Sequence, residues 1–142
     1  MIGAVALLFS EFLTWSHQFS PAFLAQWGSS FQLQGVPHNP TAWQVYSVAD
    51  VLLALLAVAL ILIALVGGRS VRIGALVAVA IALAFTLHAL SAPPTNGANI
   101  FDPSLTVPRY APNSPASGAG ETVALAALIV SMVGLALTFT TE

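Results

Sequence analysis

Four ionisable side chains stand in or beside long apolar stretches of the sequence, where a charge is costly. Glu11, Asp50, His88 and Glu121 come from four different stretches, and the topology predicted below brings all of them to the outer part of a membrane. An ionisable group inside a membrane usually faces the interior of a helix bundle and has a polar partner, which makes it a candidate functional residue. Glu11, Asp50 and His88 together have the chemistry to bind a divalent metal, relay a proton or bind a cationic ligand.

The carboxylates also have a purely structural interpretation, which we expect first. Asp50 shares a helix face with Ser47 and would hydrogen-bond neighbouring helices, while Glu11 would accept from a loop amide or from Arg109. Glu121 falls at the start of an apolar stretch, where the helix dipole favours a negative charge. The functional and the structural interpretation therefore both remain open for these residues.

His88 has a further interpretation, as an axial ligand for a haem or a chlorin, because its row of the helix carries the small residues Ala80 and Ala84. Cofactor ligation usually needs more than one recognisable contact, so we expect no bound cofactor. The sequence contains no G-x-S-x-G, no H-E-x-x-H, no phosphate-binding glycine loop and no paired histidines at helical spacing. We therefore expect no enzymatic activity.

The composition indicates that water is not the main solvent of this chain. Hydrophobic residues make up 58% of it and charged residues 6%, with a mean hydropathy of +0.91, whereas soluble domains carry about 25% charged residues. The net charge of -2 and the three basic residues provide no basic stripe, which excludes nucleic acid as a partner. The absence of cysteine excludes disulfides and thiolate metal sites.

Four apolar stretches meet or approach the roughly 20 residues that a bilayer-spanning helix needs. Asn39-Pro40 signals the start of the second stretch, Gly67-Gly68 ends it, and Pro93-Pro94 follows the third. The first stretch is the shortest and has to continue towards Phe19 to cross. We predict an all-α integral membrane protein, a single four-transmembrane-helix bundle over 1–142, with helices at about 1–19, 43–66, 71–90 and 121–141, long external loops at about 20–40 and 91–120, and a cytoplasmic turn at 67–70.

Few charges determine the predicted orientation. Arg69 and Arg72 lie in the turn after the second helix, so the positive-inside rule places this turn and both termini in the cytoplasm of a multi-pass cell membrane protein. Arg109, in the second long loop, is the one opposing charge. Trp15 and Trp43 fall at helix ends, where tryptophan anchors a helix at the headgroup level. The two external loops are rich in aromatic residues, and we expect them to fold into a small cap.

Small residues recur on one side of three of the predicted helices. Membrane helices associate through small residues that let backbones approach closely, because lipid is as apolar as leucine. We expect these rows to pack the bundle, with a dimer interface as the alternative. The rows contain Ala54 and Ala57 in the second helix, Gly74, Ala78 and Ala82 in the third, and Ser131 and Gly134 in the fourth.

Two short motifs carry a resemblance to known proteins. Phe12-Leu13-Thr14-Trp15 ends the first predicted helix, and Ala42-Trp43 opens the second together with Ser47 and Asp50. In these motifs and in the four-span plan the chain resembles small four-helix membrane proteins widespread in actinobacteria, which generally have no established function. Thr14 replaces the proline associated with the first motif, and the usual basic N-terminus is missing. The layout is also loosely similar to claudin-type tetraspan proteins, whose paired loop cysteines are absent here.

The sequence therefore favours a non-catalytic structural or accessory membrane subunit. Its expected partners are membrane lipid and either copies of itself, as a homo-oligomer, or a larger membrane protein complex. The alternative is a ligand-, metal- or pigment-binding membrane module that uses Glu11, Asp50 and His88.

Overall fold

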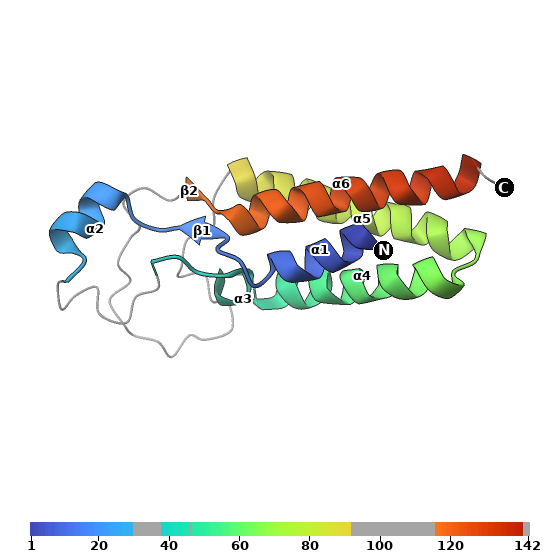
Figure 1. The fold of residues 1–142 in the computed structure, drawn as a ribbon, viewed down its shortest axis with the longest axis horizontal. Helices are drawn as coiled ribbons and strands as arrows, with labels where there is room; N and C mark the ends of the chain where they lie inside the picture. Colours follow the sequence, from blue (N-terminus) through green and yellow to red (C-terminus); the bar gives the residue numbers. More distant parts are fainter. Residues whose placement is uncertain (30–37, 46, 92–115, 141–142) are drawn as a thin grey trace.

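The computed structural model describes residues 1–29, 38–45, 47–91 and 116–140. The predicted loop at about 91–120, with Arg109, lies almost entirely outside these residues. Within them the chain is mainly helical, with two short strands (Figure 1). The elements in order are α1 (Ile2–Ser10), β1 (Ser16–His17), α2 (Pro21–Trp27), α3 (Ala42–Val45), α4 (Ser47–Val66), α5 (Arg69–Ser91), β2 (Ala116–Ser117) and α6 (Ala119–Thr140).

Three helices of the described chain are long and apolar enough to cross a membrane. They are Val48–Val66, Arg69–Ser91 and Ala119–Thr140. These match the second, third and fourth predicted helices to within a few residues. The chain turns directly from α4 into α5 at Gly67 and Gly68, so the predicted turn is shorter than expected.

The helix predicted at about 1–19 is wrong in its length. α1 has nine residues and is about 14 Å long, against about 30 Å for a bilayer core. Long-range hydrogen bonds take the chain out of the helix: the carbonyls of Thr14 and Trp15 accept from the amides of Gly120 and Gly118, both at 2.7 Å, and the Trp15 amide donates to the Pro40 carbonyl at 3.0 Å. The segment after α1 still contains Phe12, Leu13 and Trp15, but its backbone is paired with other parts of the chain.

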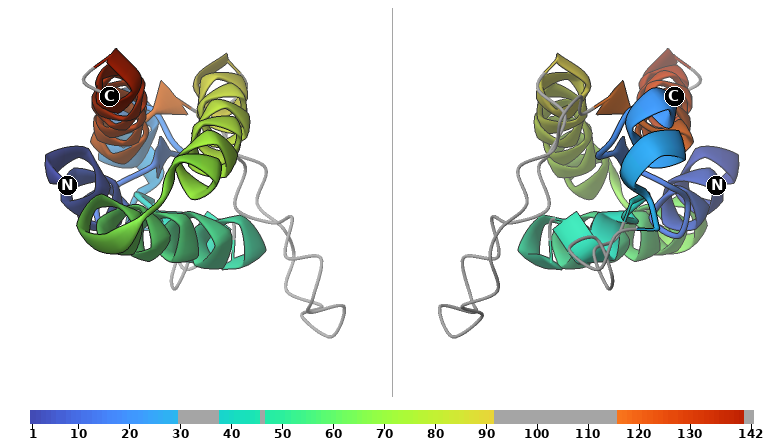
Figure 2. Two further views of the ribbon diagram at one scale, coloured as in Figure 1. Left: turned by 90° about the vertical axis from the view of Figure 1, so that its right-hand side faces the viewer. Right: turned by 90° about the vertical axis from the view of Figure 1, so that its left-hand side faces the viewer.

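The four helices α1, α4, α5 and α6 surround a common core. α1 packs against α4 and α6, and α5 packs against the same two helices from the other side. The end-on views in Figure 2 show this arrangement, and Figure 1 shows that α1 runs beside only part of its longer neighbours. The fully buried side chains of the core include Leu7, Trp15, Val79 and Leu128.

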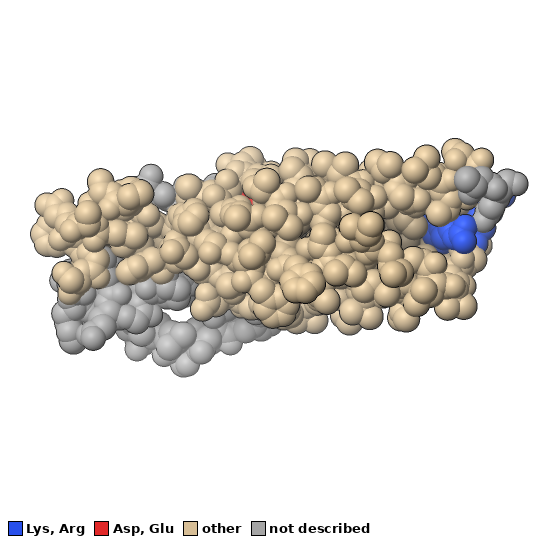
Figure 3. Space-filling model, in the orientation of Figure 1, with Lys and Arg blue, Asp and Glu red and all other residues tan. Residues whose placement is uncertain are grey.

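The two ends of the bundle differ in composition. At one end, which we call the loop end, β1 pairs antiparallel with β2, Thr14 forms a bridge with Thr41, and α2 and α3 lie nearby. At the other, which we call the arginine end, the start of α5, directly after the turn from α4, carries Arg69 and Arg72. Figure 3 shows the basic atoms gathered at the arginine end, while the long helices between the two ends present an almost uncharged surface on this face.

Candidate functional site

Trp15 organises the loop end of the bundle. Its side chain is fully buried, and its indole Nε1 donates to the Ser10 carbonyl at 2.8 Å. α6 begins directly against the indole: a Cβ added at Gly120 would lie 2.7 Å from Nε1 and 2.9 Å from the Ser10 oxygen. The expectation that Trp15 is an interface anchor is therefore wrong, because the strand pairing folds its ring inward.

Trp43 differs from Trp15 in its exposure. Its side chain is 37% exposed and lies beside Phe12, with ring centroids 6.2 Å apart. This position suits an anchor at the headgroup level, which stays a prediction for Trp43.

Three carboxyl side chains are buried at the loop end of the bundle. Glu11 follows α1 directly, Asp50 lies in the first turn of α4, and Glu121 lies in the first turn of α6 beside Gly120. Each of the three residues is 0% exposed. None of their six carboxyl oxygens has a hydrogen-bond partner in the described structure. The structural hydrogen bonds expected for Glu11 and Asp50 are therefore not found among the described residues.

The neighbouring buried polar groups are, by contrast, locally satisfied. Ser10 Oγ donates to the Leu7 carbonyl at 2.6 Å, Gln18 Nε2 donates to Ser16 Oγ at 2.6 Å, and Thr86 Oγ1 donates to the Ala82 carbonyl at 2.9 Å. Buried polar groups are generally hydrogen-bonded, and each exception calls for an explanation. Among the described residues the three carboxyls are therefore exceptional, together with His38 Nε2, which is also buried without a hydrogen-bond partner.

The electrostatics of the carboxyls favour a proton or a cation. Glu11 lies outside the three spanning helices, and burial raises the pKa of its carboxyl from 4.5 to about 7. The Glu11 carboxylate also acts electrostatically on Asp50. Two ionised carboxyls in one buried region repel each other, and an unpaired buried ion costs several kcal/mol. The pair can therefore hold a proton, or bind a cation that neutralises it.

His88 is not part of this region. Its side chain is exposed on the surface of α5, in a row with the exposed residues Ala80 and Ala84. Among the described residues no group of three or more histidines, aspartates or glutamates is arranged to hold a metal ion. The set of Glu11, Asp50 and His88 is therefore not brought together as one metal centre, because His88 lies on a face of α5 that turns away from the bundle. A cofactor on His88 stays a prediction.

The residues predicted to pack the helices divide into three groups. Ala57 and Ala82 are buried in the core, while Ala54, Ala78 and Ser131 are half-buried. Gly74 and Gly134 are exposed, and a Cβ added at either would meet nothing within 4 Å. Only some of the small residues therefore pack in the core of the bundle.

The contact of α6 with Trp15 does not follow from the apolar pattern of the sequence. Its signal is the pair Gly118 and Gly120, since a Cβ at Gly118 would overlap the backbone of Thr14 and Trp15. Two glycines at the entry to a helix permit a close approach of backbone. They position Glu121 at the loop end of the core.

No family model matches this chain, and no curated protein or solved structure matches it either. Functional proposals for the chain therefore rest on its own geometry.

Proposed function

We propose that the protein is a non-catalytic accessory subunit of a cell membrane, which assembles with copies of itself or with a larger membrane complex. In this proposal α4, α5 and α6 cross the bilayer. The shorter α1 packs between α4 and α6 in the loop-end half of the bundle. The arginine end faces the cytoplasm by the positive-inside rule, and the connections at the loop end are external. The length and hydropathy of the three long helices support this arrangement.

The observation that carries the proposal is the exposed small-residue face of α5. Ala80 and Ala84 are exposed and lie four residues apart, in line with the exposed imidazole of His88. Gly74, on the same helix, has open space where a side chain would be. We define Ala80, Ala84 and His88 as the α5 face; Gly74 lies on a neighbouring side of the helix.

Lipid gives no hydrophobic reason for burying such a face. Helices in a bilayer associate because small residues let backbones approach closely and because polar side chains hydrogen-bond across the contact, at about 0.6 kcal/mol for an average hydrogen bond. The α5 face offers both features, since His88 adds a polar group to a row of small residues. This alanine-rich row does not pack in the core of the chain. It is therefore suited to packing against a second helix.

A matched pair of substitutions on α5 tests the assembly. Ala84→Leu would hold a partner helix away from the α5 face and lower the oligomer fraction. Ile81→Leu changes a neighbouring side chain that is already large and 67% exposed, so it should leave the oligomer fraction unchanged. The fraction is measured by native mass spectrometry in a mild detergent and by crosslinking in lipid nanodiscs. A parent protein that is monomeric in both, and that also recovers no partner from its native membrane, would refute the proposal.

The unpartnered carboxyls favour a second function, in which Glu11 and Asp50 bind a small cationic ligand at the loop end. The specific observation is the burial of both carboxyls without a hydrogen-bond partner. A bound cation would supply the missing charge partner. Thermal unfolding with added divalent metal ions or organic ammonium ions tests this function: the parent should be stabilised, and Asp50→Asn should not. Equal shifts in the parent and in Asp50→Asn, or no shift in either, would exclude it.

A further inference from the structure

Glu11 and Asp50 lie at helix ends of opposite polarity. Glu11 caps the C-terminus of α1, and Asp50 lies in the first turn of α4. α1 packs against α4, and the Glu11 carboxylate acts electrostatically on Asp50. A helix carries a partial negative charge at its C-terminal end and a partial positive charge at its N-terminal end. A negative charge is therefore disfavoured at Glu11 and favoured at Asp50.

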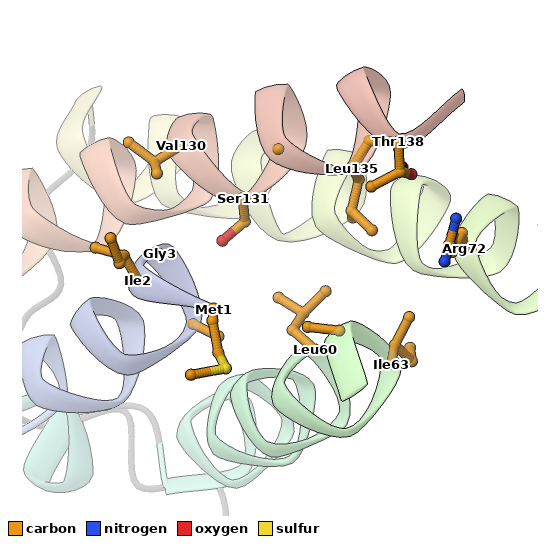
Figure 4. A pocket seen from close by; sticks show the side chains of 13 residues that line it. Met1, Ile2, Gly3, Leu60, Ile63, Arg72, Val130, Ser131, Leu135 and Thr138 are labelled. Carbon is orange, nitrogen blue, oxygen red and sulfur yellow. Dashed lines mark hydrogen bonds between the residues drawn. The ribbon is translucent and has the colours of Figure 1, made fainter. Parts of the chain in front are cut away.

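The structure leaves no room beside these two carboxyls for a ligand the size of a water molecule. Both residues are 0% exposed, and their four carboxyl oxygens are buried without a hydrogen-bond partner in the described structure. The cavity of about 400 Å³ in Figure 4 lies towards the arginine end, where Arg72 and Leu135 line it, and neither carboxyl is among its lining residues. A metal ion or an ammonium group needs space beside the oxygens that bind it. A proton needs none, because it binds on the oxygen itself.

The other titratable groups around the pair differ in their burial and position. Glu121, in the first turn of α6, is buried like the pair. His38 is half-buried at the loop end, with its ring edge-on to Phe19 and the ring centroids 5.7 Å apart. The remaining groups on the described helices and strands are exposed or lie at the arginine end: His17 in β1, and Arg69, Arg72 and His88 in α5.

We propose that Glu11 and Asp50 hold a single proton between them and exchange it with the water at the loop end. One proton removes the repulsion between two buried carboxylates, and the N-terminus of α4 favours the one charge that stays. The binding step transfers one proton from water to a carboxylate and needs no other reactant. The proposal concerns the same carboxyls as the cation-binding function, but a proton and a cation exclude each other there. It requires neither a bound cation nor the proposed assembly.

Burial keeps this proton bound at a higher pH than is usual for a carboxyl. It raises the pKa of Glu11 to about 7. Because the two carboxyls interact, the proton belongs to the pair and not to one residue. Replacing either carboxyl by a neutral amide removes the repulsion, so the remaining carboxyl should lose its proton at a lower pH.

Two substitutions in the pair and two controls test the proposal. Glu11→Gln and Asp50→Asn each replace one carboxyl by an amide of nearly the same shape. Glu121→Gln makes the same change at the third buried carboxyl, in the first turn of another helix. Arg109→Gln tests whether Arg109, which lies outside the described residues, neutralises the pair instead of a proton.

The measurement is infrared difference spectroscopy of the protein in lipid during a pH titration. The carbonyl stretch of a protonated carboxylic acid is separate from the bands of a carboxylate. We expect an acid band in the parent that disappears as the pH rises through about 7. Glu11→Gln and Asp50→Asn should each lower the midpoint of this loss by about one pH unit or more. Glu121→Gln and Arg109→Gln should leave the midpoint unchanged, as should magnesium or ethylammonium chloride.

Four results would overturn the proposal. They are an absent acid band in the parent at every pH, a midpoint that neither Glu11→Gln nor Asp50→Asn changes, a band that appears in Arg109→Gln but not in the parent, and loss of the band on adding magnesium or ethylammonium at constant pH. The last result would support the cation-binding function instead. Either substitution in the pair can show the shift, so the test holds even where one of the two variants fails to fold.

Discussion

The contact between Gly120 and Trp15 makes a sharp prediction about the loop end. In Gly120→Ala the new Cβ would lie 2.7 Å from the indole Nε1 and 2.9 Å from the Ser10 carbonyl oxygen. Contacts below 3.0 Å require atoms to move, and here both neighbours are rigid: one belongs to a buried ring and the other to the backbone. The Nε1 hydrogen bond to the same Ser10 oxygen fixes them further.

The magnitude follows from two opposing terms. Overpacking a well-packed core costs typically about 1–3 kcal/mol, whereas replacing glycine by alanine in a helix gains up to about 1 kcal/mol. Gly120 lies at the start of α6, where the gain is smallest, so we expect a net loss of about 1–2 kcal/mol. Gly74→Ala is the matched control because its Cβ would meet nothing within 4 Å. Gly74→Ala has the gain from replacing glycine in a helix and no overpacking cost, so we expect it to stabilise the protein by up to about 1 kcal/mol.

The assay is reversible unfolding of the reconstituted protein in mixed micelles with increasing sodium dodecyl sulphate, followed by tryptophan fluorescence and by far-UV circular dichroism. The fluorescence transition, to which Trp15, Trp27 and Trp43 all contribute, should occur at a lower concentration of sodium dodecyl sulphate in Gly120→Ala than in the parent. If Gly120→Ala and Gly74→Ala stabilise the protein equally, α6 does not begin against the indole and the described loop end is incorrect.

Three further predictions concern the same region. Trp15→Phe removes the indole donor of the Ser10 carbonyl, which keeps the amide of Leu13 as a donor at 3.2 Å, and should cost about 0.5–1.5 kcal/mol in the same unfolding assay; an unchanged midpoint would contradict the hydrogen bond. The raised pKa of Glu11 means that the folded state binds more protons than the unfolded state between pH 4.5 and about 7, so stability should be full below this window and fall as pH rises through it. Glu11→Gln should reduce this slope, and a slope equal to that of the parent would argue against the burial of Glu11. Gly3→Val should destabilise the contact of α1 with α6, because even a Cβ at Gly3 would lie 2.6 Å from the Ala127 carbonyl oxygen; the test is loss of a crosslink between cysteines placed on the two helices.

The long helices could be predicted from the sequence because their signals are local. Continuous apolar length, the glycines after Val66 and the proline pair after Ser91 determine the extent of α4 and α5 without reference to the rest of the chain. The end of α1 could not be predicted in the same way. Phe12, Leu13 and Trp15 continue the apolar stretch in part, but the chain leaves the helix and Thr14 and Trp15 pair with Gly118 and Gly120, about a hundred positions later in the sequence.

In the candidate site, too, features with a local sequence signal could be predicted and features that depend on tertiary packing could not. Asp50 and Glu121 lie in the first turns of their helices, so the start of each apolar stretch is a local signal for their position at one end of the bundle. His88 was grouped with them by depth alone, but it lies on the exposed face of α5. In a helix that is apolar on all sides, the hydrophobic pattern does not indicate which side meets the core.

The most direct test of the central claim, that the α5 face contacts another membrane helix, uses the absence of cysteine from the chain. Ala84→Cys places a single thiol on the α5 face, and Val51→Cys places one on an exposed position of α4. After oxidation in the native membrane, we expect Ala84→Cys to form a disulfide-linked dimer in higher yield than Val51→Cys. If the contact is with another protein, a thiol-reactive crosslinker should link Ala84→Cys to that partner in higher yield than Val51→Cys. Equal yields from the two positions, or no crosslinked product from Ala84→Cys, would contradict it.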